Sequence, residues 1–413
     1  MASVRTQRPS RELDNEKLLD RAVSLHERAR PSEARKLHLR ILRGDDPHAQ
    51  RAFARVAQNH RMFELAARLL AKAIRLGLDE ADMHNDLGVA LLGCERPAEA
   101  EASFRTACAL EPADAMVLRN LARALTDGGD LAAAASSLES AIGLAPTNPV
   151  GLLDLAELRL GEGHPDDALR LIERALAPEP HATRALALQS VALCELGEGQ
   201  RLSELIDPVR FIACIGAEEF ACAGQGDLAN FNARLRNHIS RHRALTREPR
   251  GLATRKGWNT VGNLLRDEAP LMRDLERLTR DAITRYVAAL PVQPHHPFLQ
   301  QRRVDFRLEA WGVKLQREGH QEPHIHRDGW LSGVYYVSLG EIVRDDDPAH
   351  EGWIEFGRAP ERLMGIGRAP ITHLVRPREG TFVIFPSYLW HRTLPFSQAG
   401  ERFSFAFDVI PLR

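Results

Sequence analysis

Two short histidine-containing segments in the last hundred residues carry side chains that could bind a metal. In EPHIHRDGW, His326 and Asp328 are two residues apart, so on an extended strand both side chains leave the same face. A histidine beside a carboxylate supplies two of the three ligands of a 2-His-1-carboxylate site for Fe(II). The third candidate is His391, in FPSYLWHRT, because intervening strands can return it to the same cavity. The pattern predicts a metal site made by His326, Asp328 and His391.

Two alternatives for these positions remain open from spacing alone. His324 could replace His326 as a ligand, since the two histidines are also two residues apart and point the same way. We favour His326, because only this histidine has a carboxylate two residues later, and we expect His324 beside the metal or facing the substrate. Asp328 is followed by Gly329, and an Asp-Gly pair is also typical of an ordinary turn.

A second pair of side chains could hold an anion. Arg402 and Ser404 lie eleven and thirteen residues after His391 and alternate on one face of a predicted strand. The planar guanidinium of an arginine binds a carboxylate through two parallel hydrogen bonds, and a hydroxyl beside it adds a third. The pair therefore suits a ligand that carries a carboxylate.

The elements that position these residues are predicted to be strands. Apolar and polar residues alternate in several runs after residue 303, and glycine or proline separates one run from the next. These runs are VDFRLEAWGVKLQ, LSGVYYVSL, GWIEFG, GTFVIFP and RFSFAFDVI. Many short strands within about 110 residues predict a β-sandwich or barrel.

The N-terminal half is predicted to be helical and repetitive. Four columns of residues recur with a period of 34: Leu87, Leu121 and Leu155; Ala100, Ala134 and Ala168; Ala107, Ala141 and Ala175; Pro112, Pro146 and Pro180. The period and the residue types resemble those of the tetratricopeptide repeat, in which small residues allow helices to cross closely. The resemblance implies an α-solenoid over residues 15–200 with a groove for a protein or peptide, although a purely supporting role stays open.

Residues 201–299 are predicted to form a helical connecting region without this period. The stretch from Arg266 to Leu290 has apolar residues at helical spacing and ends at the proline-rich PVQPHHP. The fold class is therefore multidomain α and β: a repeat solenoid over 15–200, a helical support over 201–299 and a strand-rich domain over 300–413.

Composition excludes several classes of protein. The 413 residues carry 55 basic and 56 acidic side chains, which argues against nucleic acid or an acidic membrane as the main partner. The sequence has no apolar run long enough to span a bilayer and no secretory signal, and its five cysteines include no C-x-x-C pair. We expect a cytoplasmic protein.

The C-terminal motifs together resemble the Fe(II)/2-oxoglutarate-dependent oxygenases, in their prolyl-hydroxylase-like branch. The order His326-x-Asp328, His391 and Arg402-x-Ser404 carries the resemblance, and GTFVIFP resembles the strand that leads to the distal histidine. The resemblance implies a double-stranded β-helix over 300–413, with His326, Asp328 and His391 as ligands of Fe(II).

The same resemblance implies how the co-substrate is held. Arg402 would pair with the C5 carboxylate of 2-oxoglutarate, helped by Ser404 and by the hydroxyl of Tyr336. Gln316 stands at a position where that branch often has a further tyrosine.

The implied function is a dioxygenase that uses Fe(II), 2-oxoglutarate and O2 to hydroxylate an unactivated carbon. The repeats make a protein or peptide side chain the expected substrate. Two alternatives remain: an interaction scaffold whose β-domain is not catalytic, and an oxygenase acting on a small metabolite or a free amino acid.

Overall fold

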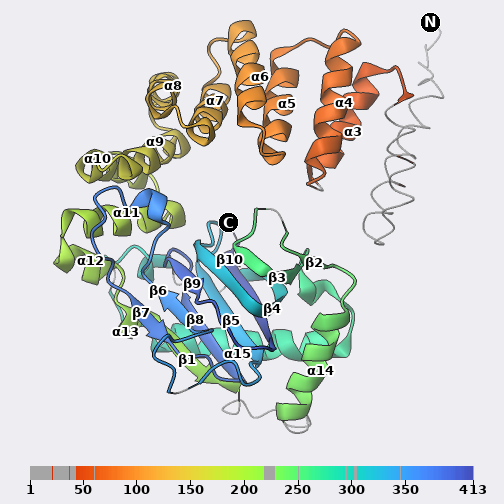
Figure 1. Cartoon of the computed structure of the whole chain (residues 1–413). Coiled ribbons are helices and arrows are strands. Elements are labelled where there is room, and N and C mark those ends of the chain that lie inside the picture. Colours follow the sequence, from red (N-terminus) through yellow and green to blue (C-terminus); the bar gives the residue numbers. More distant parts are fainter. Residues whose placement is uncertain are drawn as a thin grey trace, which may run out of the picture. The chain divides into compact units, whose positions relative to one another are not determined.

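The computed structural model describes residues 43–59, 61–217, 228–249, 251–293, 295–301, 305–344 and 346–412, together with residues 21 and 37 (Figure 1). The chain divides into two compact units, residues 1–155 and 156–413. Most of residues 15–42, the start of the predicted repeat domain, lie outside the described residues. None of the helices described here is long and apolar enough to cross a membrane.

The first unit consists of helices joined by short turns. Successive helices contact one another as antiparallel pairs, as expected for a solenoid of two-helix repeats. The helices are α3 (Pro47–Asn59), α4 (Phe63–Arg75), α5 (Ala81–Gly93), α6 (Pro97–Leu110), α7 (Ala115–Gly128), α8 (Leu131–Leu144) and the first part of α9 (Pro149–Gly161). The predicted α-solenoid is confirmed.

Small residues at the repeat period explain how the helices pack. Ala100 and Ala134, one period apart, are both fully buried, because a methyl group is all that fits where two helices approach closely. Aspartates fix two of the helix starts. The side chain of Asp114 accepts the backbone N–H of Met116 at 2.7 Å, and that of Asp130 accepts the N–H of Ala133 at 3.0 Å.

The second unit contains the last repeat helices and all the described strands. Its helices after α9 are α10 (Pro165–Leu176), α11 (Thr183–Leu196), α12 (Gly199–Leu205), α13 (Pro208–Phe211), α14 (Leu228–Arg241) and α15 (Pro270–Ala289). Its strands are β1 (Ala213–Gly216), β2 (Leu245–Arg247), β3 (Thr254–Thr260), β4 (Phe306–His324), β5 (Leu331–Ser338), β6 (Ile354–Phe356), β7 (His373–Val375), β8 (Thr381–Pro386), β9 (His391–Thr393) and β10 (Glu401–Pro411).

The strands form one antiparallel sheet that curls on itself. Its order is β1-β8-β5-β10-β4-β9-β6-β7, with β3 also pairing with β4 and β2 with β3. The long strand β4 makes the curl, because its first part pairs with β10 and its last residues pair with β9. This arrangement is consistent with the predicted jelly roll, and Figure 1 shows the strands gathered around β4, β5 and β10.

Strand β10 separates two environments. Its odd-numbered residues Phe403, Phe405, Phe407 and Val409 are fully buried. Helix α14 packs against β4 and β5, and helix α15 packs against β8. The even-numbered residues Arg402, Ser404 and Ala406 line a cavity on the other side of the sheet. The alternation of strand side chains thus places apolar residues in the core and polar ones in the cavity.

Helix α11 is joined to the strand region by buried polar contacts. The carboxylate of Glu195, which is 1% exposed, accepts the backbone N–H groups of Ile366, Gly367 and Arg368 in the loop before β7. The indole N–H of Trp390 donates to the carbonyl of Ala187 at 3.0 Å. Removing α11 would abolish these contacts and leave the indole N–H of Trp390 without its partner.

A pair of truncations tests the structural role of α11. We expect a protein lacking residues 1–148 to unfold cooperatively, because it keeps α9 whole together with α10 and α11. A protein lacking residues 1–200 should aggregate or unfold without a cooperative transition. The deletion removes Glu195 and Ala187, and with them their hydrogen bonds to the loop before β7 and to Trp390. Thermal unfolding followed by circular dichroism measures both. Equal cooperativity in the two proteins would show that α11 is dispensable.

Candidate metal centre

Three histidines meet at the mouth of the curled sheet. His324 is the last residue of β4, His391 is the first residue of β9, and the two are direct partners in the antiparallel register. His326 lies two residues after the end of β4, and its backbone N–H donates to the carbonyl of Ser387 at 3.1 Å. The curl of β4 toward β9 therefore brings a residue from FPSYLWHRT onto the EPHIHRDGW segment, as the sequence predicted for His391.

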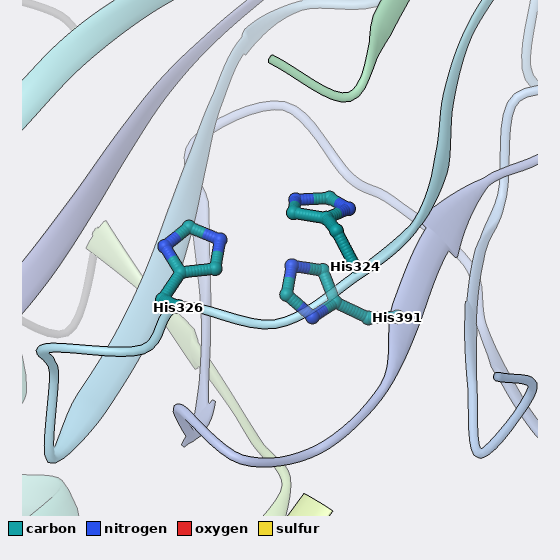
Figure 2. Close-up of side chains that lie close together, drawn as sticks. All are labelled: His324, His326 and His391. Carbon is teal, nitrogen blue, oxygen red and sulfur yellow. The ribbon is translucent and has the colours of Figure 1, made fainter. Parts of the chain in front are cut away.

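The three rings are close enough to bind one metal ion together. Ring centroids are 4.2 Å apart for His324 and His391, 5.1 Å for His326 and His391, and 5.2 Å for His324 and His326. One nitrogen from each ring lies within 4.8 Å of the other two. Figure 2 shows the three imidazoles gathered around a common space, two from one segment and one from a different strand. Three converging imidazole nitrogens suit a transition metal.

Hydrogen bonds fix which nitrogen of each ring is available. The Nδ1 atom of His324 lies 2.7 Å from the carbonyl of Glu322, and that of His391 lies 2.9 Å from the carbonyl of Leu389. A carbonyl only accepts, so each Nδ1 carries the proton. Nε2 then keeps its lone pair, which is the form in which a histidine binds a metal.

For His326 the acceptor is a carboxylate. Its Nδ1 lies 2.6 Å from Oδ1 of Asp408 on β10. An ionised carboxylate only accepts hydrogen bonds, so Nδ1 of His326 carries the proton as well. All three rings thus present the same tautomer, with Nε2 left for a metal.

Burial favours the neutral form of two of these rings, His324 and His391. It lowers the pKa of His324 to about 3, and the adjacent His326 lowers it further. Burial also lowers the pKa of His391 well below its usual value, with smaller effects from the two neighbouring histidines. Neutral imidazoles do not repel a cation, so His324 and His391 are in the form that binds a metal.

Asp328, the carboxylate predicted to complete the site, lies outside this group, and His324 takes a place in it. Strand β4 ends at His324, and the chain turns at residues 327–328. The rule that residues two apart share a face holds only while the backbone stays extended. The Asp328 side chain is consequently exposed, as in the turn that the Asp-Gly pair also allowed.

The anion-binding residues predicted from the sequence line the same cavity as the histidines. Arg402, Ser404 and Tyr336 form part of its wall. Ser404 and Tyr336 are direct partners in the register of β10 and β5, and the Arg402 guanidinium carbon lies 5.1 Å from the centre of the Tyr336 ring. Gln316, on β4, pairs with Glu401 in the register and does not line the cavity.

Arg402 is buried without a counter-charge. Its side chain donates to the carbonyl of Gly352 at 2.5 Å, and the residue is only 3% exposed. Among the described residues, neither Nε of Arg402 nor the hydroxyl of Tyr336 has a partner at good hydrogen-bond geometry, although the two side chains lie close enough to interact with each other. Burial lowers the pKa of Arg402 and raises that of Tyr336 to about 12, so the phenol stays protonated and can donate. Two unused donors on one cavity wall fit a carboxylate.

Sequence reasoning missed two residues that support the histidines. Asp408 holds His326, and the ring of Trp311 stacks on His326 with centroids 5.5 Å apart and planes 21° apart. A signal for Asp408 was present, because it follows Arg402 and Ser404 at the strand period of two. Nothing in the spacing identified Trp311.

A second group of possible ligands, His238, His242 and Asp267, has a different hydrogen-bond pattern. The backbone N–H of Ala244 donates to Nδ1 of His242 at 3.2 Å, so in the neutral ring Nε2 carries the proton. Nε2 of both histidines faces Oδ2 of Asp267, at 3.2 Å for His238 and 3.7 Å for His242. A protonated nitrogen has no lone pair for a metal, so His242 in this form does not offer its Nε2 to one. The group lies where the end of α14 meets the segment before α15.

Family models match both parts of the chain. Models described as "Tetratricopeptide repeat" match residues 51–112, 91–149 and 125–191. The model described as "Putative 2OG-Fe(II) oxygenase" matches residues 309–408, which contain the three histidines, Arg402 and Asp408. The chain carries tetratricopeptide repeats over residues 51–191 and a C-terminal putative 2OG-Fe(II) oxygenase domain over residues 309–408. No curated protein was found to be similar to the chain.

The solved structures similar to the chain include repeat proteins. MamA is 18% identical, covers 39% of this chain and 92% of its own, and has a TM-score of 0.35. YrrB, described as a TPR protein with an unusual peptide-binding site, is 19% identical, with 40% and 84% covered and a TM-score of 0.34. PilW, a type IV pilus biogenesis factor, is 20% identical, with 48% and 92% covered and a TM-score of 0.39.

Replacing the unpaired arginine tests whether the cavity is built for an anion. We expect Arg402→Met to leave the free energy of unfolding unchanged or raise it by up to about 2 kcal/mol, because it removes a buried charge that has no counter-ion. Succinate, a simple dicarboxylate, should raise the melting temperature of the wild-type protein and not that of Arg402→Met. Arg344→Met, at an exposed residue, is the control. A variant that is strongly destabilised and still stabilised by succinate would contradict this account.

Proposed function

We propose that the protein is an Fe(II)- and 2-oxoglutarate-dependent dioxygenase that hydroxylates a carbon of a protein or peptide substrate. One observation carries the proposal: a single cavity holds three histidines with Nε2 free to coordinate and a buried arginine without a counter-ion. A metal would bind to the three histidines, and a dicarboxylate would supply the negative charge that the buried arginine lacks. The match to the oxygenase family over residues 309–408 supports the same class.

In this proposal the iron ligands are His324, His326 and His391. The Nδ1 contacts of all three rings support the assignment, and the exposed position of Asp328 argues against the triad predicted from the sequence. Three imidazoles are all neutral ligands, whereas the predicted set contained one carboxylate. They would hold the metal through three nitrogens, with further coordination positions available for a co-substrate and O2.

Arg402 would bind the C5 carboxylate of 2-oxoglutarate through its unused Nε–H, with the Tyr336 hydroxyl as a second donor and Ser404 beside them. The bound iron and 2-oxoglutarate would supply oxidising chemistry, in which 2-oxoglutarate is decarboxylated to succinate while a C–H bond of the substrate is hydroxylated. The protein's own residues orient the dicarboxylate and limit the access of water to the cavity. Fully buried Tyr336 and Arg402 serve both purposes.

The repeats are proposed to recruit the substrate. Tetratricopeptide repeats present a surface to protein partners, and here they cover residues 51–191. A protein or peptide side chain is therefore preferred to a small metabolite or a free amino acid.

The deciding experiment measures succinate formed from 2-oxoglutarate when the purified protein is supplied with Fe(II) under air. We expect slow succinate formation without substrate, because such oxygenases turn over weakly in an uncoupled reaction. A folded wild-type protein that binds no Fe(II) and forms no succinate would favour the alternative, an interaction scaffold with a non-catalytic β-domain. The substrate is then identified in two steps. Proteins that remain bound to a His391→Ala variant are captured, and the same proteins treated with the wild-type enzyme are examined for the mass of one added oxygen atom.

A matched pair of variants tests the ligand assignment. We expect His324→Ala to lose Co(II) or Fe(II) binding by at least about a hundredfold, because one of three ligands is removed. Asp328→Ala should bind the metal as the wild-type protein does, because its side chain is exposed in a turn. Metal titration of the two folded variants makes the comparison. Loss of binding in Asp328→Ala with retention in His324→Ala would restore the triad predicted from the sequence.

The role of Arg402 is tested by keeping its charge and changing its shape. Arg402→Lys loses a charge-assisted hydrogen bond worth about 1.5–3 kcal/mol, which predicts an apparent affinity for 2-oxoglutarate lower by about ten- to a hundredfold. Tyr336→Phe, which removes one neutral hydroxyl, should have a smaller effect. The KM for 2-oxoglutarate in uncoupled turnover and the metal content measure both changes. An unchanged KM in Arg402→Lys would mean that another residue binds the carboxylate.

A further inference from the structure

Asp408 is the only carboxylate among the described residues that contacts one of the three histidines through its side chain. Its Oδ1 lies 2.6 Å from Nδ1 of His326, and its side chain is 16% exposed. His324 and His391 use backbone carbonyls of their own segments for the same purpose. His326 follows the end of β4 and depends on an acceptor from a different strand, β10.

We infer that Asp408 is a positioning residue of the metal centre, which fixes the orientation and the tautomer of His326 and supplies the negative charge that the three neutral ligands lack. The inference rests on the proposed function, because it assumes that the three histidines bind a metal. Asp408 does not itself line the cavity, so it acts through His326.

The carboxylate is held in place by two buried serines. Ser332 on β5 donates its hydroxyl proton to Oδ1 of Asp408 at 2.7 Å. The two serine oxygens, of Ser332 and Ser387, lie 2.8 Å apart, and because the single proton of Ser332 goes to Asp408, Ser387 is the donor between them. Both serines are at most 1% exposed. The carboxylate thus has one orientation, set by β5 and by the turn after β8.

The same turn also holds the backbone of His326. The carbonyl of Ser387 accepts the backbone N–H of His326 at 3.1 Å, and the backbone N–H of Ser387 donates to the carbonyl of Trp330 at 3.1 Å. A Cβ atom at Gly329 would lie 2.5 Å from the Ser387 hydroxyl, so glycine is needed for this close approach. The backbone and the ring of His326 are therefore fixed by one connected network.

The charge of Asp408 has a chemical consequence. A histidine that donates Nδ1–H to a carboxylate is a more basic ligand than one that donates to a carbonyl, because the carboxylate stabilises positive charge on the ring. In a 2-His-1-carboxylate site the negative charge binds the metal directly. Here the negative charge lies one imidazole away, behind His326.

The test compares metal affinities of the full-length protein by titration with Co(II), followed by its visible absorption bands. We expect Asp408→Ala to bind Co(II) ten- to a hundredfold more weakly than the wild-type protein. Asp408→Asn, which keeps a hydrogen-bond acceptor of the same shape and loses the charge, should fall between the two. The absorption bands of both variants should shift, since the basicity of one ligand changes, and a residue with a purely structural role would not move them.

Glu401→Gln is the matched control, because it removes a negative charge from the same strand at an exposed residue paired with Lys314. Its Co(II) affinity should stay within about twofold of the wild-type value. Melting temperatures without metal check that the variants are folded, and Asp408→Asn serves if Asp408→Ala does not fold.

The outcomes separate this inference from the proposed function. A wild-type protein that does not bind Co(II) overturns the proposed function. If the wild-type protein binds Co(II) through the three histidines, and Asp408→Asn and Asp408→Ala bind it with the same affinity and the same spectrum as the wild type, only the role of Asp408 is overturned. A similar loss in Glu401→Gln would also overturn it, because the effect would then come from net charge alone.

Discussion

The candidate metal centre depends on the hydrogen-bond acceptors behind its three histidines. Three imidazoles can bind one cation only if each presents a lone pair, and a neutral ring has a lone pair on one nitrogen alone. Two backbone carbonyls and the carboxylate of Asp408 accept the Nδ1 protons and leave the Nε2 atoms for the metal. Two of these histidines face each other across β4 and β9, so the curl of a single long strand is the structural condition for the site.

The cavity wall next to these histidines contains buried polar groups whose interactions are incomplete. A buried arginine without a carboxylate and a tyrosine hydroxyl without a partner both destabilise a folded protein, and such groups are tolerated where a ligand restores their interactions. The apolar face of β10 offsets the cost. Phe403 and Phe405 are completely buried on the side away from the cavity, so one strand stabilises the fold with its odd residues and binds ligands with its even ones.

The sequence was informative where a pattern is long or repeated. The period of 34 residues predicted the solenoid, and the alternation in RFSFAFDVI predicted that Arg402 and Ser404 share a face. The prediction was least secure at a strand end. Whether His324 or Asp328 joins His326 depends on the residue at which β4 ends, and apolar-polar alternation does not specify that residue. The strand period places Asp408 on the same face as Arg402 and Ser404, but local spacing does not identify His326, on a distant segment, as its partner.

The last repeat helices lie in the same compact unit as the strands. Composition changes near residue 200 and predicts a boundary there, and the family models place the repeats up to residue 191. The second compact unit begins at residue 156, and its helix α11 forms hydrogen bonds with the loop before β7. Trp390, whose indole is fixed by α11, directly precedes His391. Helix α11 therefore belongs to the compact unit that contains His391 and contacts the residue directly before it.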